Sequence, residues 1–171
     1  MKDEGAMQPL SLSTFTSVVL KPGEVDWWAS VPANAGWYAV RTDTPHSVFG
    51  QLQHPPAAKT KHYNLAGRYV ASSYLRASGS VIAPREPGGI YVVYSGEAKD
   101  LKARAREHTH GNSGTACLAL SNYAVLHSQH WEFLYLTCES HVNGSNGDKV
   151  LRTYLEQRWR GENGWPLLCT Q

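Results

Sequence analysis

Short hydrophobic runs of strand length recur at three places in this chain, separated by longer polar stretches. Residues 36–41 are β-prone and are bounded by turn-forming residues on both sides. Residues 89–95 are apolar without alternation, which is typical of a strand buried on both faces of a sheet. Residues 131–138 are rich in aromatic and other β-favouring residues. We therefore predict a small sheet of three core strands, with a further β-rich run at 15–20.

Apolar residues at helical spacing lie between and after these strands. We predict a helix over 64–77, a second that starts near Lys99, a short third over 116–125, and a last one after Asp148, whose side chain can cap a helix start. Gly161 and the Gly-Trp-Pro that follows it end this last helix. Its predicted apolar stripe consists of Val150, Leu151, Tyr154, Leu155 and Trp159.

The length of 171 residues and the hydrophobic content of 42% suit one packed domain, which we expect to span residues 1–171. Its expected fold class is α/β (α+β). Residues 1–35 form an N-terminal extension packed onto the core. Residues 42–88, which hold most of the prolines, form an insertion between the first two core strands.

The formal net charge is only +2, so a contact with nucleic acid requires a local basic face rather than the field of the whole protein. Basic residues gather between residues 99 and 106, although acidic residues partly offset them, and a solvated helix face has the same pattern. The basic residues are Lys99, Lys102, Arg104 and Arg106, and the acidic ones are Glu97, Asp100 and Glu107.

The three cysteines, Cys117, Cys138 and Cys169, are far apart and form no Cys-x-x-Cys pair. This spacing indicates neither a disulfide framework nor a structural zinc site, and it fits a reducing compartment. The N-terminus is acidic and lacks a long apolar run, so we expect neither a signal peptide nor a membrane span. The expected location is the cytoplasm.

The segment from Tyr94 to His108 contains the clearest candidate chemistry. A hydrophobic strand passes through Gly96 into a basic helix, and the glycine predicts a turn after Tyr94. In that helix Arg104 and His108 lie on the same face as the apolar Leu101 and Ala105, a face about 100° wide. Taken alone, these two residues suit an ordinary pair of Arg104 with an aspartate one turn earlier and a histidine at a helix C-terminus.

This segment resembles the second half of the GIY-YIG nuclease signature, in which a Tyr-x-Gly strand end precedes a helix with an arginine and often a histidine one turn later. The resemblance implies a three-stranded antiparallel sheet flanked by helices, with the active site on one sheet edge. The first tyrosine of the signature then corresponds to Tyr38 in Gly36-Trp37-Tyr38, because Gly89-Ile90-Tyr91 lies too close to Tyr94 to form a separate strand. The long insertion that follows Tyr38 is similar to the restriction-endonuclease branch.

The resemblance implies a role for each matching residue. Glu156 would bind one Mg²⁺ or Mn²⁺ ion, Arg104 would neutralise the phosphate, and either Tyr38 or His108 would be the general base. Glu97 departs from the lysine or serine of many relatives, and is either a second metal ligand or outside the site. The catalytic set is Tyr38, Tyr94, Arg104, His108 and Glu156, and the substrate-binding set is Lys102, Arg106 and Asn163.

We therefore expect a metal-dependent endonuclease that hydrolyses double-stranded DNA, of the restriction type, with a possible homodimer that cuts both strands. In that case the helix at 64–77 could help to read the bases. A repair or mobile-element nuclease of the same superfamily is the first alternative. A catalytically inactive module that binds nucleic acid is the alternative from another class.

Overall fold

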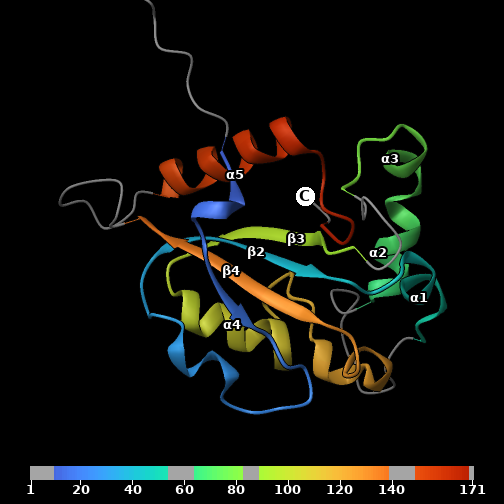
Figure 1. Ribbon diagram of the computed structural model, residues 1–171, viewed down its shortest axis with the longest axis horizontal. Helices are drawn as coiled ribbons and strands as arrows, with labels where there is room; N and C mark the ends of the chain where they lie inside the picture. Colours follow the sequence, from blue (N-terminus) through green and yellow to red (C-terminus); the bar gives the residue numbers. More distant parts are fainter. Residues whose placement is uncertain (1–9, 54–63, 83–88, 139–148, 170–171) are drawn as a thin grey trace, which may run out of the picture.

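An antiparallel sheet of four strands forms the centre of the protein, with helices on both of its faces (Figure 1). The computed structural model describes residues 10–53, 64–82, 89–138 and 149–169. The spatial order of the strands is β1-β4-β2-β3. Their bounds are β1 (Thr16–Val19), β2 (Gly36–Thr42), β3 (Tyr91–Ala98) and β4 (Trp131–Thr137).

The three predicted core strands are confirmed as β2, β3 and β4, and the mixed α/β class with an antiparallel sheet is confirmed with them. The β-rich run of the N-terminal extension pairs with β4 as a fourth strand. The sheet is therefore larger than the three-stranded layout that the resemblance implied. β3 stands at one edge of it, next to β2.

The predicted turn at Gly96 is wrong, because β3 continues through this residue to Ala98. Gly96 pairs with Tyr38 of β2. A Cβ atom at position 96 would lie 2.5 Å from the Tyr38 hydroxyl oxygen and 2.8 Å from the ring carbon that carries it. The glycine is thus required by the close approach of the tyrosine side chain and not by a change of chain direction.

Two long helices flank the sheet, and the shorter ones lie in the insertion and the connections. α4 starts where the Asp100 side chain accepts a hydrogen bond from the backbone N–H of Ala103 (2.8 Å). α5 runs past Gly161 and ends before Gly164, which has a φ of +99°. The α-helices are α1 (His46–Gln51), α2 (Leu65–Ala71), α3 (Ser73–Ala77), α4 (Leu101–His110) and α5 (Lys149–Asn163).

Two helix predictions need correction. The stretch 116–125 is not a helix but contains two 3₁₀ turns, η4 (Leu120–Asn122) and η5 (Ala124–Leu126), because Ala119 before them has a left-handed backbone. The stretch 64–77 divides at Ser72 into α2 and α3. Two further 3₁₀ turns lie in the N-terminal part, η1 (Leu12–Thr14) and η2 (Trp27–Ser30).

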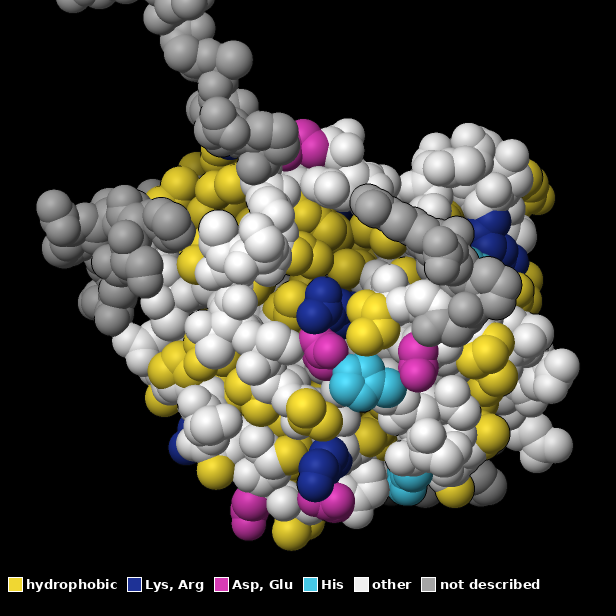
Figure 2. All heavy atoms as spheres, in the orientation of Figure 1, with side chains coloured by type: hydrophobic (Ala, Val, Ile, Leu, Met, Phe, Trp, Pro, Cys, Tyr) yellow, Lys and Arg dark blue, Asp and Glu magenta, His cyan; other side chains and the backbone are white. Residues whose placement is uncertain are grey.

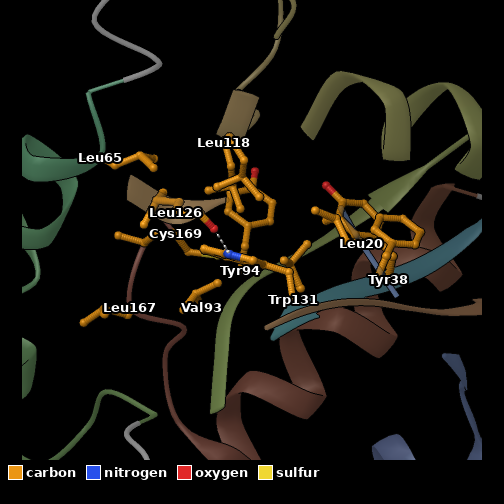
Figure 3. Close-up of a cluster of buried hydrophobic side chains, with 14 of the residues drawn as sticks. Leu20, Tyr38, Leu65, Val93, Tyr94, Leu118, Leu126, Trp131, Leu167 and Cys169 are labelled. Atoms are coloured by element: carbon orange, nitrogen blue, oxygen red, sulfur yellow. Dashed lines mark hydrogen bonds between the residues drawn. The ribbon is translucent and has the colours of Figure 1, made fainter. Parts of the chain in front are cut away.

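The two faces of the sheet support separate hydrophobic clusters. The larger one lies on the α4 side and contains Tyr38, Tyr94 and Trp131 together with the C-terminal residues Leu167 and Cys169 (Figure 3). The smaller one lies on the α5 side and contains Trp37, Ala39, Val92 and Trp159. Because side chains alternate along a strand, consecutive residues of β2 enter different clusters.

The predicted apolar stripe of α5 is only partly correct. Val150 is 72% exposed and Tyr154 is 50% exposed, whereas Trp159 is buried. The other buried residues of this helix are the charged side chains Arg152, Glu156 and Arg160. These charged side chains face Ser95 and Glu97 of β3. Ion pairs as well as apolar contacts therefore determine which face of α5 packs against the sheet.

Charge on the visible surface is dispersed. Figure 2 shows one face of the molecule, on which the Lys and Arg side chains are few and scattered rather than gathered into a broad basic surface. Cys117, Cys138 and Cys169 are buried free thiols. Among the helices that the structure describes, none has the combination of length and apolarity needed to cross a membrane.

The contact between Gly96 and Tyr38 predicts opposite outcomes for two glycine-to-alanine substitutions. Gly96→Ala forces the Tyr38 ring away and should lower the free energy of unfolding by about 1–3 kcal/mol. Gly161→Ala, in the interior of α5, meets no atom within 4 Å and should raise it by about 0.5–1 kcal/mol. Urea unfolding of both variants checks this pair, and equal stabilities would contradict the proposed contact.

Candidate active site at the edge of the sheet

From Tyr94 onward, β3 places its side chains alternately on the two faces of the sheet, after a register shift at Val93. Because β3 is an edge strand, both sets reach the same opening. Tyr94 and Gly96 pair with Val40 and Tyr38 and share their face, on the α4 side. Ser95 and Glu97 point to the α5 side. A pocket of about 280 Å³ lies around this edge, and its lining includes Tyr38, Tyr94, Ser95, Arg104, Glu156 and Arg160.

The hydroxyl of Tyr38 is the centre of the pocket wall on the α4 side. Arg104 donates to it from Nε (2.8 Å), and Nε2 of His108 lies 3.0 Å from it. Nη1 of Arg104 donates to Glu107 one turn later in α4 (2.8 Å), which fixes the guanidinium in this orientation. The predicted pairing of Arg104 with an aspartate one turn earlier is absent, since Asp100 caps the helix instead.

His108 is fully buried, and its two ring nitrogens are both engaged. The backbone N–H of Leu118 donates to Nδ1 (3.2 Å), so Nδ1 carries no proton. Burial, with Arg104 and Arg68 nearby, holds the pKa of His108 well below its usual range and keeps the ring neutral. The single ring proton therefore resides on Nε2 and is donated to the Tyr38 oxygen.

The Tyr38 oxygen thus accepts hydrogen bonds from two N–H groups, one of Arg104 and one of His108, although the Tyr38 side chain is fully buried. Burial raises the pKa of Tyr38 well above 10, and the neighbouring Tyr94 adds to this effect, whereas Arg104 opposes it. Tyr94 is stacked on Tyr38 with ring centroids 6.2 Å apart and packs edge-on to His108 at 4.8 Å. Burial also raises the pKa of Tyr94 to about 12.

Glu156 forms the opposite wall, where it is 6% exposed. Its Oε1 pairs with Arg160 and accepts a long hydrogen bond from the Ser95 hydroxyl (3.4 Å). Burial raises the pKa of the Glu156 carboxyl, while Arg160 and Ser95 act in the other direction. The pair of Glu156 with Arg160, four positions later in α5, is buried.

Arg160 is held firmly by its surroundings. Its Nε donates to the Ser95 hydroxyl (2.9 Å) and its Nη2 to the Ser95 carbonyl (3.0 Å). The guanidinium carbon also lies 4.5 Å from the centre of the Trp165 ring. The position of Glu156 is thereby tied to the β3 backbone through a rigid cation.

Glu97, the residue that departs from the family pattern, forms an ion pair with Arg152 of α5 at 2.8 Å. The Arg152 side chain is 3% exposed and the Glu97 side chain 24% exposed. The pair offsets the negative charge of Glu97, and Arg152 itself is not among the described residues that line this pocket.

The predicted substrate-binding residues do not reach the pocket. Nζ of Lys102 donates to the Ala29 carbonyl (3.1 Å), and Arg106 is exposed. Each is two positions from Arg104, about 200° around α4, so neither shares its face. Asn163 bonds to the Trp159 carbonyl (2.9 Å) and lies about 10 Å along the α5 axis from Glu156, at 1.5 Å per residue.

Several residues of the site were missed from the sequence. Arg152 and Arg160 stand four positions before and after Glu156, and this spacing could have indicated a common inward face. Buried Arg68 of α2 donates to the Cys117 carbonyl (3.1 Å) and the Leu168 carbonyl (3.4 Å). Arg68 thereby connects the insertion to the core, and no local sequence pattern predicts this role.

Glu156, to which the resemblance assigned a divalent ion, is a buried carboxylate paired with Arg160. Among the described residues, no three His, Cys, Asp or Glu side chains gather as a metal site. Zinc requires three or four such ligands, whereas Mg²⁺ is bound by one or two carboxylates with waters and substrate phosphate oxygens. The described lining of the pocket has two carboxylates, Glu97 and Glu156, so by residue type the predicted ion would be Mg²⁺ or Mn²⁺ rather than zinc.

Comparisons of the chain with models of protein families, with curated proteins and with solved structures found no match. The functional assignment therefore depends on the chemistry of the pocket itself. Two features carry that chemistry: a tyrosine oxygen that accepts hydrogen bonds from an arginine and a histidine, and a buried carboxylate across from it.

The neutral state of His108 predicts a loss of stability in acid. In the unfolded chain this histidine binds a proton below pH 6.5, its ordinary pKa, while the folded chain resists protonation, so stability falls as the pH drops. In His108→Gln, whose amide N–H can still donate to Tyr38, the decrease between pH 7 and pH 5 should be smaller by up to about 2 kcal/mol. Urea unfolding at each pH measures the difference, and identical pH profiles would contradict the buried neutral imidazole.

Proposed function

We propose that this protein is a metal-dependent DNA endonuclease of the GIY-YIG type that hydrolyses phosphodiester bonds. The observation that carries the proposal is the Tyr38 hydroxyl, held by Arg104 Nε at 2.8 Å and His108 Nε2 at 3.0 Å in the pocket that also contains Glu156. A base, a fixed cation and a carboxylate are the groups that phosphodiester hydrolysis requires. Tyr38, Arg104 and Glu156 belong to β2, α4 and α5, and they meet at one edge of the sheet, which supports a common role.

Of the two candidate bases, the geometry favours Tyr38. His108 has no lone pair that faces the pocket, because Nδ1 accepts from Leu118 and Nε2 donates to Tyr38. The Tyr38 oxygen, by contrast, receives two N–H groups, and both stabilise its phenolate form. Tyr38 would accept the proton of the attacking water, and His108 would orient Tyr38.

Arg104 would stabilise the charge that develops on the phosphate. Its Nε is bound to Tyr38 and its Nη1 to Glu107, while Nη2 has no hydrogen-bond partner among the described residues. Nη2 is therefore available for a phosphoryl oxygen. Since Glu107 holds the guanidinium in place, this stabilisation needs little rearrangement during the reaction.

Glu156 would hold the divalent ion, with Arg160 and Ser95 fixing the carboxylate from behind. The ion supplies a Lewis acid that polarises the phosphate and offsets charge on the leaving oxygen. Arg160 counteracts the effect of burial on the pKa of Glu156 and so favours the ionised form that a cation needs.

Within this class we propose a restriction-type enzyme that recognises double-stranded DNA. The insertion contributes α2 and α3, whose outer surface carries apolar side chains, with Val70 63% exposed and Tyr74 87% exposed. Exposed apolar groups on short helices are suited to contacts with a partner surface or with base edges. A homodimer would place two such sites on one duplex.

A catalytically inactive nucleic-acid-binding module is the second candidate. The observation in its favour is the buried ion pair between Glu156 and Arg160, which already neutralises the carboxylate in the absence of a metal. In that case the fold and the DNA contacts would persist without cleavage.

Cleavage of plasmid DNA, with Mg²⁺ or with EDTA, separates the two candidates. We expect cleavage only with the metal, and a decrease of at least about 100-fold in Tyr38→Phe, Arg104→Ala and Glu156→Gln. Lys21→Gln, which removes a cation paired with Glu24 away from the pocket, should cleave like the wild type. Circular dichroism verifies that each variant folds. Cleavage that survives all three substitutions would exclude this site, and binding without cleavage would indicate the inactive module.

The pH dependence of cleavage tests which residue is the base. Because the pKa of Tyr38 is raised, the phenolate fraction grows about tenfold per pH unit between pH 7 and 9, and the single-turnover rate should grow in parallel. A histidine base with a lowered pKa is already neutral at pH 7 and gives a flat profile. His108→Gln should be slower yet retain the slope, and a flat wild-type profile would refute Tyr38 as the base.

A further inference from the structure

A second opening continues directly from the candidate active site. It is a groove of about 500 Å³, and it shares Glu97, Arg104 and Ala116 with the smaller pocket. Lys99 at the start of α4 and Lys149 at the start of α5 lie on its walls. A chain that occupies the pocket can therefore extend into the groove without leaving the surface of the protein.

The acidic groups of the groove are all engaged by protein partners. Glu97 pairs with Arg152 at 2.8 Å, and Glu107 accepts from Arg104 at 2.8 Å. Asp100 accepts the hydrogen bond that caps α4 at 2.8 Å. Lys99 and Lys149, by contrast, are exposed and form no ion pair with a residue that the structure describes. The described lining has four basic and three acidic side chains, so its formal net charge is positive.

Arg152 adds a buried donor to the same groove. The residue is only 2% exposed, and its Nε donates to Glu97. Neither Nη group forms a hydrogen bond with the described part of the chain, although Arg152 lines the groove. A planar pair of guanidinium N–H groups matches two oxygens of a phosphate.

We propose that this groove is a subsite for a second phosphodiester of the nucleic-acid strand, next to the one that Arg104 contacts. The proposal depends on the proposed function for the identity of the ligand. Arg152 would form the directed contact, and Lys99 and Lys149 would add two point charges at the rim. The described lining contains no aromatic side chain on which a base could stack, so the subsite recognises the backbone and not the sequence.

The dependence of DNA binding on salt tests this subsite without requiring catalysis. The affinity of a fluorescent DNA duplex is measured by anisotropy in EDTA at several KCl concentrations, for the wild type and for Lys99→Gln/Lys149→Gln. Each lost phosphate contact reduces the slope of log K against log salt by about 0.9. Between about 50 and 200 mM KCl, the wild type should therefore lose about three- to fourfold more affinity than the double variant.

A matched double variant controls for net charge. Lys21→Gln/Lys102→Gln removes the same two charges, but Lys21 pairs with Glu24 and Lys102 contacts the Ala29 carbonyl, outside the groove. Its slope should equal that of the wild type. Glu97→Ala/Arg152→Ala, which removes the ion pair as a unit, should also weaken binding and lower the slope.

Each outcome separates the two proposals. Equal slopes in the groove variant and the wild type, or equal decreases in both lysine variants, would overturn the subsite while plasmid cleavage still supports the nuclease. A lowered slope in the groove variant alone, without cleavage by the wild type, would support the subsite and reject the nuclease. Absence of any DNA binding by the wild type would reject both.

Discussion

The site depends on the close approach of the Tyr38 side chain to the backbone of Gly96. Tyr38 belongs to an inner strand, so its hydroxyl can reach the pocket only by passing over the edge strand β3. A Cβ atom at position 96 would stand 2.5 Å from that hydroxyl, which leaves glycine as the residue that fits. The same pairing sets the register of β3, and the register directs Ser95 and Glu97 to the opposite face. The contact between Gly96 and Tyr38 thereby fixes the position of the α4 wall of the pocket relative to its α5 wall.

Three arginines hold the carboxylates of this edge: Arg104 with Glu107, Arg152 with Glu97, and Arg160 with Glu156. Ion pairs removed from water contribute little to folding, because desolvation offsets much of their attraction. Apolar side chains on the inner face of α5 would stabilise the protein at least as well. Charged pairs are therefore concentrated at this edge of the sheet, and Glu156 with Arg160 is the most deeply buried of the three.

Much of this arrangement could be predicted from local patterns in the sequence. The three core strands and the shared face of Leu101, Arg104, Ala105 and His108 follow from periodicities of two and 3.6 residues, and the structure has both. Gly96 was misread as a turn, since an isolated glycine looks the same whether it ends a strand or makes room for a neighbour.

The inward face of α5 could not be read from the sequence because its apolar residues occupy two faces, and tertiary ion pairs decide between them. Val150 and Tyr154 consequently lie outside, and Arg152 and Arg160 inside. The buried position of Arg68 could not be predicted from local sequence either, because its hydrogen-bond partners are 49 and 100 positions away in the chain.

The loop after α4 links these observations to the chemistry at Tyr38. Glu107, which orients Arg104, is itself held by Asn112 (2.6 Å) and Thr115 (3.2 Å) of that loop. A few residues later, the N–H of Leu118 occupies Nδ1 of His108 and places the ring proton on Nε2. Both groups that donate to the Tyr38 oxygen are therefore positioned by the short segment 112–118, through two side chains and one backbone N–H. Burial raises the pKa of Tyr38, and Arg104, which this loop orients through Glu107, acts in the opposite direction.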